Sequence, residues 1–162
     1  MGPIAICLWF DDQAEEAAKF YTSVFKSSKI LETTRYPEAG HEIHGKRAGS
    51  VLTVTFEING QRIIGLNGGP QFKFTEAASL SVDCSTQEEI DYYWEKLTSG
   101  GGSPGPCGWL KDRFGLSWQI VSTEVQRMLL DRDRARVERV FAAIMNSSKV
   151  DIAALTRAFE GK

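Results

Sequence analysis

The amino-acid sequence repeats a helix-like segment after 73 residues. QAEEAAKFY (13–21) can be laid over TQEEIDYYW (86–94), so that a pair of glutamates and a pair of aromatic residues coincide. A strand-like segment precedes each copy, and several extended segments follow it. A repeat of this kind is typical of a duplicated supersecondary unit. We therefore predict two βαβββ modules, at about 4–67 and 78–121, that together form one domain (1–122).

The first module carries the clearest secondary-structure signals. The apolar run Ile4 to Phe10 predicts a buried strand, and Asp11 or Asp12 is expected to cap the helix that follows. Asn59-Gly60 separates two alternating segments and is typical of a type I′ hairpin turn. The other strands of this module are predicted at 29–36, 50–58 and 61–67. The predicted helix carries an apolar stripe of Ala14, Ala17, Ala18, Tyr21 and Phe25.

A polar loop from Pro37 to Gly49 contains the only histidines of the chain, in the sequence HEIH (41–44). Their spacing is compatible with metal ligands on a helix, although HEIH is not the HExxH motif of zinc proteases. A solvated loop is the simpler interpretation. A pH-sensitive lid over a binding site is the other alternative.

The second module repeats the order of the first, and a different region follows it. We predict a strand at 78–84, a helix capped by Ser85 or Thr86, and strands at 109–111 and 116–122. Residues 123–162 are rich in Arg, Ala, Leu and Val and are predicted to form two or three short helices. Because short helices are marginal alone, this C-terminal extension should pack on the body or on a second subunit.

Composition limits the partners and the compartment. The 162 residues carry a formal net charge of −2, which gives no general attraction for nucleic acid or an anionic membrane. The three cysteines, Cys7, Cys84 and Cys107, form no CxxC pair and favour a reducing, cytoplasmic location. Acidic residues follow the first apolar run, so we expect neither a signal peptide nor a membrane span there.

Four segments resemble the PhnB-like group of the vicinal-oxygen-chelate, or glyoxalase-like, superfamily. They are ICLWFDDQAEEAAKFYTSVF (6–25), FEINGQRIIGLNGGPQFKFTEAASLSVDC (56–84), CGWLKDRFGLSWQIVS (107–122) and VDIAALTRAFEGK (150–162). The resemblance implies an α+β fold in which two βαβββ modules form a curled mixed sheet around a cleft, plus C-terminal helices. It also implies a homodimer. Members of the group often carry the label 3-demethylubiquinone-9 3-methyltransferase.

The resemblance further implies where a divalent metal would bind. Metal-dependent enzymes of the superfamily take one ligand from the first strand and one from the last strand of each module. In this chain the four positions fall at Cys7, at Asn67, near Ala77 to Ser79, and at Gln119. Divalent ions depend on ionised oxygen ligands or imidazoles, and these positions supply neither. We predict that the chain binds no metal and no other cofactor.

Strand parity predicts which side chains face the cleft instead. In the first strand, Cys7 and Trp9 alternate with the apolar residues that would face the helix. Asn67 is expected to point into the cleft from its place opposite the lost carboxylate. The second module adds Ser79, Ser81, Trp109 and Gln119. Aromatic walls with a few amides and hydroxyls suit a small, flat or partly apolar organic molecule.

The sequence therefore favours a metal-free homodimer that binds a small organic ligand. The alternative is an enzyme of the same superfamily, a lyase, isomerase or group transferase, with Asn67 and Gln119 as polarising groups and Cys7 beside them. The methyltransferase label lacks support from the residues. A doubly wound methyltransferase needs a glycine-rich turn after its first strand, and this strand is followed by Asp11-Asp12-Gln13.

Overall fold

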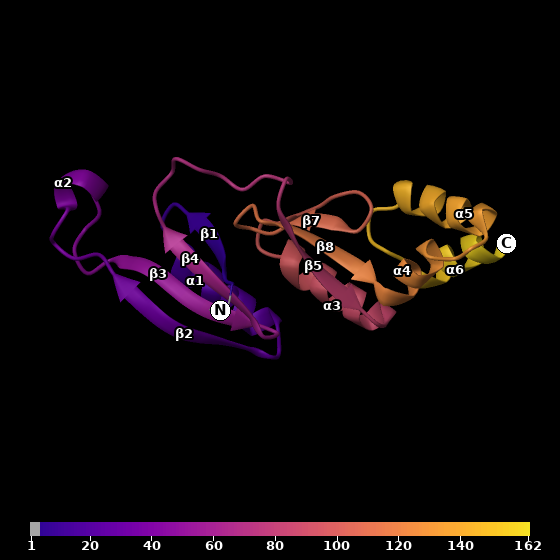
Figure 1. The fold of residues 1–162 in the computed structure, drawn as a ribbon, viewed down its shortest axis with the longest axis horizontal. Helices are drawn as coiled ribbons and strands as arrows, with labels where there is room; N and C mark the ends of the chain where they lie inside the picture. The colour runs from indigo at the N-terminus through magenta and orange to yellow at the C-terminus, as the bar shows by residue number, and fades with distance from the viewer. Residues whose placement is uncertain (1–3) are drawn as a thin grey trace. The chain divides into compact units, whose positions relative to one another are not determined.

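The same four-stranded sheet is built twice along the chain (Figure 1). The computed structural model describes residues 4–162, which divide after Lys73 into two units. The strand order is β1-β4-β3-β2 in the first unit and β5-β8-β7-β6 in the second. The predicted α+β fold with two mixed βαβββ sheets is confirmed, and neither sheet closes into a barrel. That the two modules form one domain stays a prediction.

The four strands of the first sheet form one parallel pairing and two antiparallel pairings. Strands β1 and β4 are parallel, whereas β3 is antiparallel to both β4 and β2. Its elements are β1 (Ile6–Phe10), α1 (Ala14–Val24), β2 (Ser28–Arg35), α2 (His41–His44), β3 (Val51–Ile58) and β4 (Gln61–Asn67). The HEIH segment, which we expected in a loop, thus forms a single short turn of helix within that loop.

The predicted hairpin between β3 and β4 is confirmed. Ile58 pairs with Gln61, and the two residues between them have positive φ angles, 48° at Asn59 and 83° at Gly60. A type I′ turn needs positive φ at both central positions, and Asn and Gly tolerate it best. This turn fixes the register of the strands that follow and precede it.

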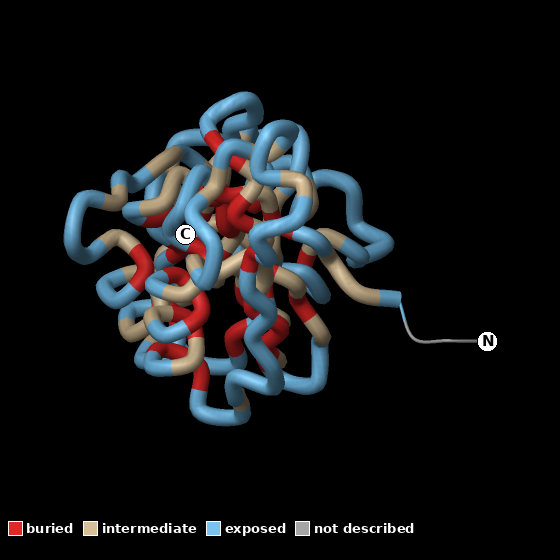
Figure 2. Tube along the Cα trace, turned by 90° about the vertical axis from the view of Figure 1, so that its left-hand side faces the viewer, coloured by how far each residue is buried: buried red, intermediate tan, exposed pale blue. Residues whose placement is uncertain are grey.

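Helix α1 covers one face of the first sheet. Its stripe of Ala14, Ala17, Ala18 and Tyr21 is completely buried, as the apolar spacing predicted. On the sheet, Val54 and Phe56 are completely buried as well, and the Tyr21 and Phe56 rings stack with centroids 6.0 Å apart. Along β4, buried positions alternate with half-buried ones, whereas most residues of the connecting loops are exposed (Figure 2). The other face of this sheet therefore carries no helix of its own unit.

The second unit repeats this plan with the predicted offset. Helix α3 begins at Gln87, 73 residues after the start of α1. The elements are β5 (Ser79–Cys84), α3 (Gln87–Thr98), β6 (Ser103–Pro104), β7 (Trp109–Lys111) and β8 (Ser117–Ser122). The Thr86 hydroxyl accepts a hydrogen bond from the Glu89 N–H, which confirms one of the two predicted caps. Trp118 and Ile120 are buried on the helix-covered side of the sheet.

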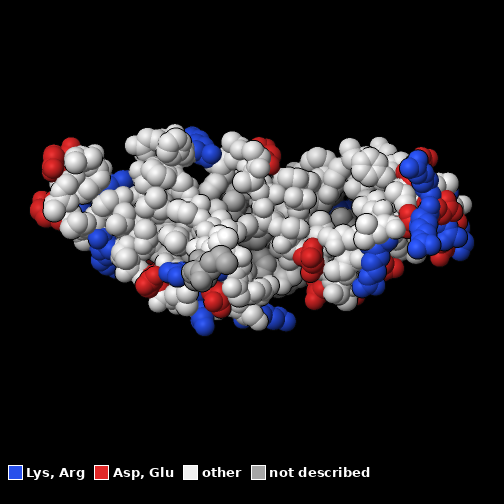
Figure 3. Space-filling model, viewed as in Figure 1, with Lys and Arg blue, Asp and Glu red and all other residues white. Residues whose placement is uncertain are grey.

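Three capped helices follow the second sheet, as predicted. They are α4 (Thr123–Leu129), α5 (Arg134–Met145) and α6 (Ile152–Glu160), with side-chain caps from Ser122, Asp133 and Asp151. Side chains of both charge signs are exposed on them (Figure 3). Along residues 4–162, none of the helices has the length and apolar character needed to cross a membrane.

The segment between α5 and α6 fastens these helices to the second sheet. The backbone N–H groups of Cys107 and Gly108 donate to the carbonyls of Ser147 and Ser148, at 2.9 and 2.6 Å. The Gln87 side-chain amide both donates to the Val150 carbonyl and accepts from the Ile152 N–H. The predicted packing of the extension on the body is therefore present within the second unit.

Candidate functional site

The helix-free face of the first sheet carries Cys7 and Trp9, as strand parity predicted. Cys7 is exposed and Trp9 is half-buried. The Trp9 indole N–H donates to the Gly69 carbonyl at 2.8 Å, and its ring meets the Phe72 ring edge-on at 4.9 Å. A Cβ atom added to Gly68 would lie 2.2 Å from the Trp9 ring. Trp9 is thus packed against the segment that leaves β4.

The predicted inward orientation of Asn67 is wrong. Asn67 is 5% exposed, and its Oδ1 accepts the Ala14 N–H at 2.8 Å while its Nδ2 donates to the Val51 carbonyl at 3.1 Å. The residue pairs with Phe10, which faces helix α1, so its side chain points to the helix as well. The Asn67 side chain therefore provides the hydrogen-bond acceptor for the first backbone N–H of α1.

Asn67 also takes the place of the expected cap of helix α1. The N-cap position is Gln13, whose side chain makes no capping bond, and the cap expected from Asp11 or Asp12 is not formed. Leu66 pairs with Trp9, so Leu66 rather than Asn67 takes the place on the helix-free face. An apolar side chain therefore stands where the superfamily would place a carboxylate.

The second sheet brings four predicted site residues together. Ser81 lies opposite Gln119 in the parallel pair of β5 and β8, and Trp109 lies opposite Gln119 across β7 and β8. The Gln119 Nε2 donates to the Ser79 Oγ at 2.9 Å. Amide, hydroxyl and indole groups therefore share one face of this sheet. These are the neutral hydrogen-bonding groups that the sequence predicted for it.

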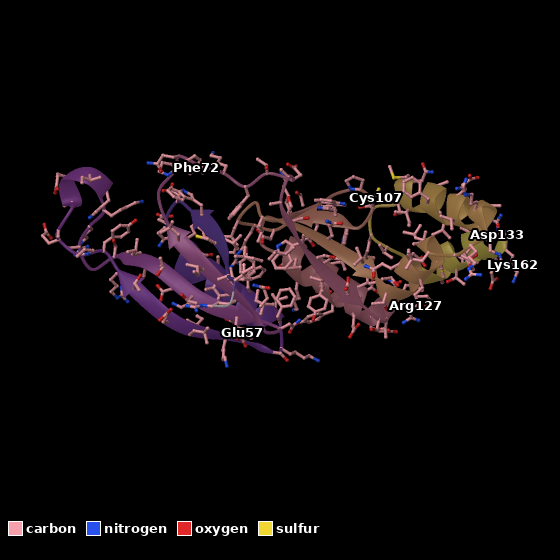
Figure 4. The ribbon with its side chains drawn as sticks, in the orientation of Figure 1. Glu57, Phe72, Cys107, Arg127, Asp133 and Lys162 are labelled. Atoms are coloured by element: carbon pink, nitrogen blue, oxygen red, sulfur yellow. The ribbon has the colours of Figure 1, made fainter. Side chains whose placement is uncertain are left out.

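A cavity of about 570 Å³ lies at this sheet, within the second unit. Its volume is in the usual range for small-molecule sites. Of the lining residues, Trp109 was predicted as a site residue from the sequence, and strand parity places Ser117, two residues before Gln119 in β8, on the same face. The residues that matter most for its chemistry are Glu76, Pro104, Pro106, Trp109, Lys111 and Ser117. Cys107, which also lines the cavity, lies in the loop before β7 (Figure 4).

Two polar features distinguish this cavity. Ser117 is completely buried, and in the part of the chain that the structure describes its Oγ has no hydrogen-bond partner. The Lys111 Nζ contacts the Glu76 Oε1 at 2.7 Å, with 40% and 65% of the two side chains exposed. This hydrogen bond from Lys111 lowers the pKa of Glu76, so the carboxylate stays ionised. The cavity thus combines an unsatisfied hydroxyl with one exposed ion pair.

Other polar groups in this unit have structural roles. Asp112 is only 3% exposed, although it begins the turn between β7 and β8. Its carboxylate accepts hydrogen bonds from the Phe114 and Leu116 backbone N–H groups and from the Trp118 indole N–H, the last at 2.7 Å.

Burial raises the pKa of the Cys84 thiol to about 12, with smaller contributions from the charges of Glu89 and Asp83. That thiol is protonated and inert at neutral pH.

The residues at the superfamily's ligand positions do not fit a divalent metal. With the corrected orientation they are Cys7 and Leu66 in the first sheet and Ser79 and Gln119 in the second. All four are neutral, and Gln119 already bonds to Ser79. Within residues 4–162 the structure also contains no group of three or more His, Cys, Asp or Glu side chains arranged to hold a metal ion.

Comparisons with known proteins agree with this architecture. The sequence model of the 3-demethylubiquinone-9 3-methyltransferase family matches residues 3–121, which ends just before α4. The PhnB protein from Bacillus cereus is 36% identical, with a TM-score of 0.64 over 75% of this chain and 100% of that chain. Its description carries the same methyltransferase name. No protein with a curated description matches the chain.

Two more distant structures share the fold. PA1353 from Pseudomonas aeruginosa is 15% identical, with a TM-score of 0.58 over 75% of this chain and 98% of that chain. The fosfomycin resistance protein FosX from Listeria monocytogenes, solved with Mn(II) and sulfate, is 16% identical. Its TM-score is 0.54 over 80% of this chain and 95% of that chain. The family model and the PhnB protein show that the chain belongs to the PhnB-like family that bears the name 3-demethylubiquinone-9 3-methyltransferase, within the vicinal-oxygen-chelate superfamily.

Proposed function

We propose that this protein is a metal-free, homodimeric small-molecule-binding protein whose ligand occupies the cavity beside Trp109. The observation that carries the proposal is the Ser117 hydroxyl, completely buried and without a partner at the cavity. An unsatisfied buried hydroxyl costs about 1–3 kcal/mol, and native structures hold few of them. A bound ligand that hydrogen-bonds to Ser117 would remove this cost.

The neutral groups near the cavity support a binding role. Trp109 supplies a flat apolar wall, and Gln119 and Ser79 lie on the same sheet face.

We do not propose the methyltransferase activity that the family name suggests. Strand β1 runs into Asp11, Asp12 and Gln13, and this turn contains no glycine for a nucleotide-like cofactor.

An exposed edge strand supports the homodimer. Strand β2 lies at the edge of the first sheet, and its Ile30 and Leu31 are 39% and 45% exposed. Uncovered edge strands with apolar side chains invite pairing with another chain. The three unpaired cysteines support a cytoplasmic location, where thiols stay reduced.

Native mass spectrometry of gently purified protein tests the proposal. We expect a species of about 36 kDa, twice the 18.0 kDa chain, that carries an organic molecule and no divalent metal. Stoichiometric metal by elemental analysis would contradict the metal-free part of the proposal. A monomer at micromolar concentration would contradict the homodimer. Conversion of the released molecule by the protein would favour the enzyme alternative.

A matched pair of serine variants tests the observation itself. Ser117→Ala removes the unsatisfied hydroxyl, so the ligand-free protein should gain up to about 1 kcal/mol in unfolding free energy while ligand affinity falls. Ser122 is equally buried, but its hydroxyl caps α4, so Ser122→Ala should lose about 1 kcal/mol without changing affinity. Equal destabilisation by both substitutions would mean that Ser117 already has a partner.

A further inference from the structure

The cavity of the second unit contains one possible anchor for a charged ligand. Of the ten residues that line it, all in the described part of the chain, Lys111 is the one base and Glu76 the one acid. The other lining residues are small, apolar or uncharged. A ligand group that pairs with an ammonium would therefore be held at Lys111.

In the ligand-free protein, the Glu76 carboxylate pairs with the Lys111 ammonium. Glu76 lies between β4 and β5, outside any strand or helix, and its side chain is the more exposed partner of the ion pair. Exposed ion pairs contribute little to stability, so the contact can be exchanged for another at small cost. A competing carboxylate on a ligand would offer Lys111 the same chemistry and would add contacts that Glu76 cannot make.

Those further contacts come from the rest of the lining. Trp109, Pro104 and Pro106 present flat apolar surface, which suits an aromatic or aliphatic body. Ser117 offers a buried hydroxyl for one hydrogen bond. The lining therefore combines a cation, an apolar wall and a hydroxyl in one cavity.

We propose that the ligand is a small organic carboxylate with an apolar body, and that its carboxylate displaces Glu76 from Lys111. This inference rests on the proposed binding function and specifies the ligand class for the same cavity. Glu76 then acts as an internal competitor that weakens binding of every carboxylate ligand. Because it is a competitor, its removal should tighten binding, which a merely structural ion pair would not do.

Fluorine NMR with two matched probes tests this directly. The probes are 4-fluorophenylacetate and its neutral amide, 4-fluorophenylacetamide, which differ only at the group that would meet Lys111. We expect the acid to bind more tightly than the amide. Glu76→Gln should tighten the acid roughly threefold to tenfold, and Lys111→Met should weaken it by a similar factor, with little effect on the amide.

The Lys149–Asp91 ion pair provides matched controls in the same unit. Its side chains are 42% and 49% exposed, similar to those of the Lys111–Glu76 pair, but neither residue lines this cavity. Asp91→Asn and Lys149→Met should leave both affinities unchanged. Equal effects of the control and cavity variants would indicate general charge effects and would overturn the inference.

The remaining outcomes separate the two proposals. Binding of the amide as tightly as the acid, unchanged by Lys111→Met, would overturn the carboxylate inference and leave the cavity as a binding site. Weaker acid binding in Glu76→Gln would show that Glu76 assists rather than competes, which also overturns it. If neither probe binds any variant at millimolar concentration, the cavity itself is not the ligand site and both proposals fail.

Discussion

Replacement of Asn67 by alanine should destabilise the fold rather than impair ligand binding. The Asn67 side chain joins the end of β4 to the first N–H of helix α1 and to the Val51 carbonyl. Ala14 is completely buried, so in Asn67→Ala its N–H would have neither a protein partner nor solvent. Alanine can form neither hydrogen bond and is too small to fill the space.

The structure gives the size of this effect. A buried donor left without a partner costs about 1–3 kcal/mol, and loss of the second, partly buried bond adds about 0.5–1 kcal/mol. We therefore expect a loss of about 1.5–4 kcal/mol in unfolding free energy. For a chain of this length that corresponds to a fall of about 4–12 °C in melting temperature.

Urea and thermal unfolding, followed by circular dichroism, measure this loss. Asn146→Ala is the matched control because Asn146 is exposed and its side-chain amide donates to the Ala142 carbonyl of its own helix end. The control should change stability by less than about 0.5 kcal/mol. If Asn67→Ala keeps wild-type stability but loses affinity for ligand, then Asn67 is a ligand group and the structural role assigned to it is wrong.

Three further substitutions or labels test separate parts of the fold. Gly68→Ala would place a methyl group inside the Trp9 ring, so the unfolding free energy should fall by about 1–3 kcal/mol and the tryptophan fluorescence emission should shift. An unchanged emission spectrum would contradict the packing of Trp9 against Gly68. Asp112→Asn weakens the acceptor of three N–H groups, so we expect a loss of about 2–4 kcal/mol in urea unfolding, and a loss below 1 kcal/mol would refute it. Iodoacetamide at pH 8 should label the exposed Cys7 in the folded protein and spare Cys84, because with the pKa of Cys84 raised to about 12 only about one thiol in ten thousand is ionised. Equal labelling of Cys84 and Cys7, measured by peptide mass spectrometry, would refute its burial.

The sequence was sufficient for the elements whose determinants are local. The Asn59-Gly60 turn, the Thr86 cap and the apolar stripe of α1 each depend on a few neighbouring residues, and the structure contains all three. The repeat then predicted the second module from the first. Its helix begins where the offset placed it because duplicated segments keep their order even when their residues diverge.

The orientation of Asn67 could not be predicted in this way. Parity within β4 shows that Asn67 and Leu66 point to opposite faces, but it does not show which face is which. That choice depends on the pairing of β4 with β1, where Phe10 lies opposite Asn67. The relevant signal was Phe10 itself, an apolar residue already expected to face the helix.

The cavity was beyond sequence reasoning for a different reason. Its lining combines Glu76 from the segment before β5, Pro104 from β6, Pro106 from the loop that follows β6, and Ser117 from β8. Residues so far apart along the chain meet only through the register of β6, β7 and β8. No local pattern marks Glu76 as the partner of Lys111, because a single exposed acid in a connecting segment has no distinctive context.

The strand order has a consequence for synthesis on the ribosome. In each unit the first strand pairs with the last one. Strand β1 therefore cannot form its pair until β4 has been synthesised, and β5 cannot form its pair until β8 has been synthesised. Such distant pairings slow folding, since a long loop has to be ordered first. The first sheet is complete once Asn67 has emerged, well before β8 has been translated. A nascent chain can therefore close one sheet while the other is still being made, which shortens the time that two unfinished sheets are exposed together.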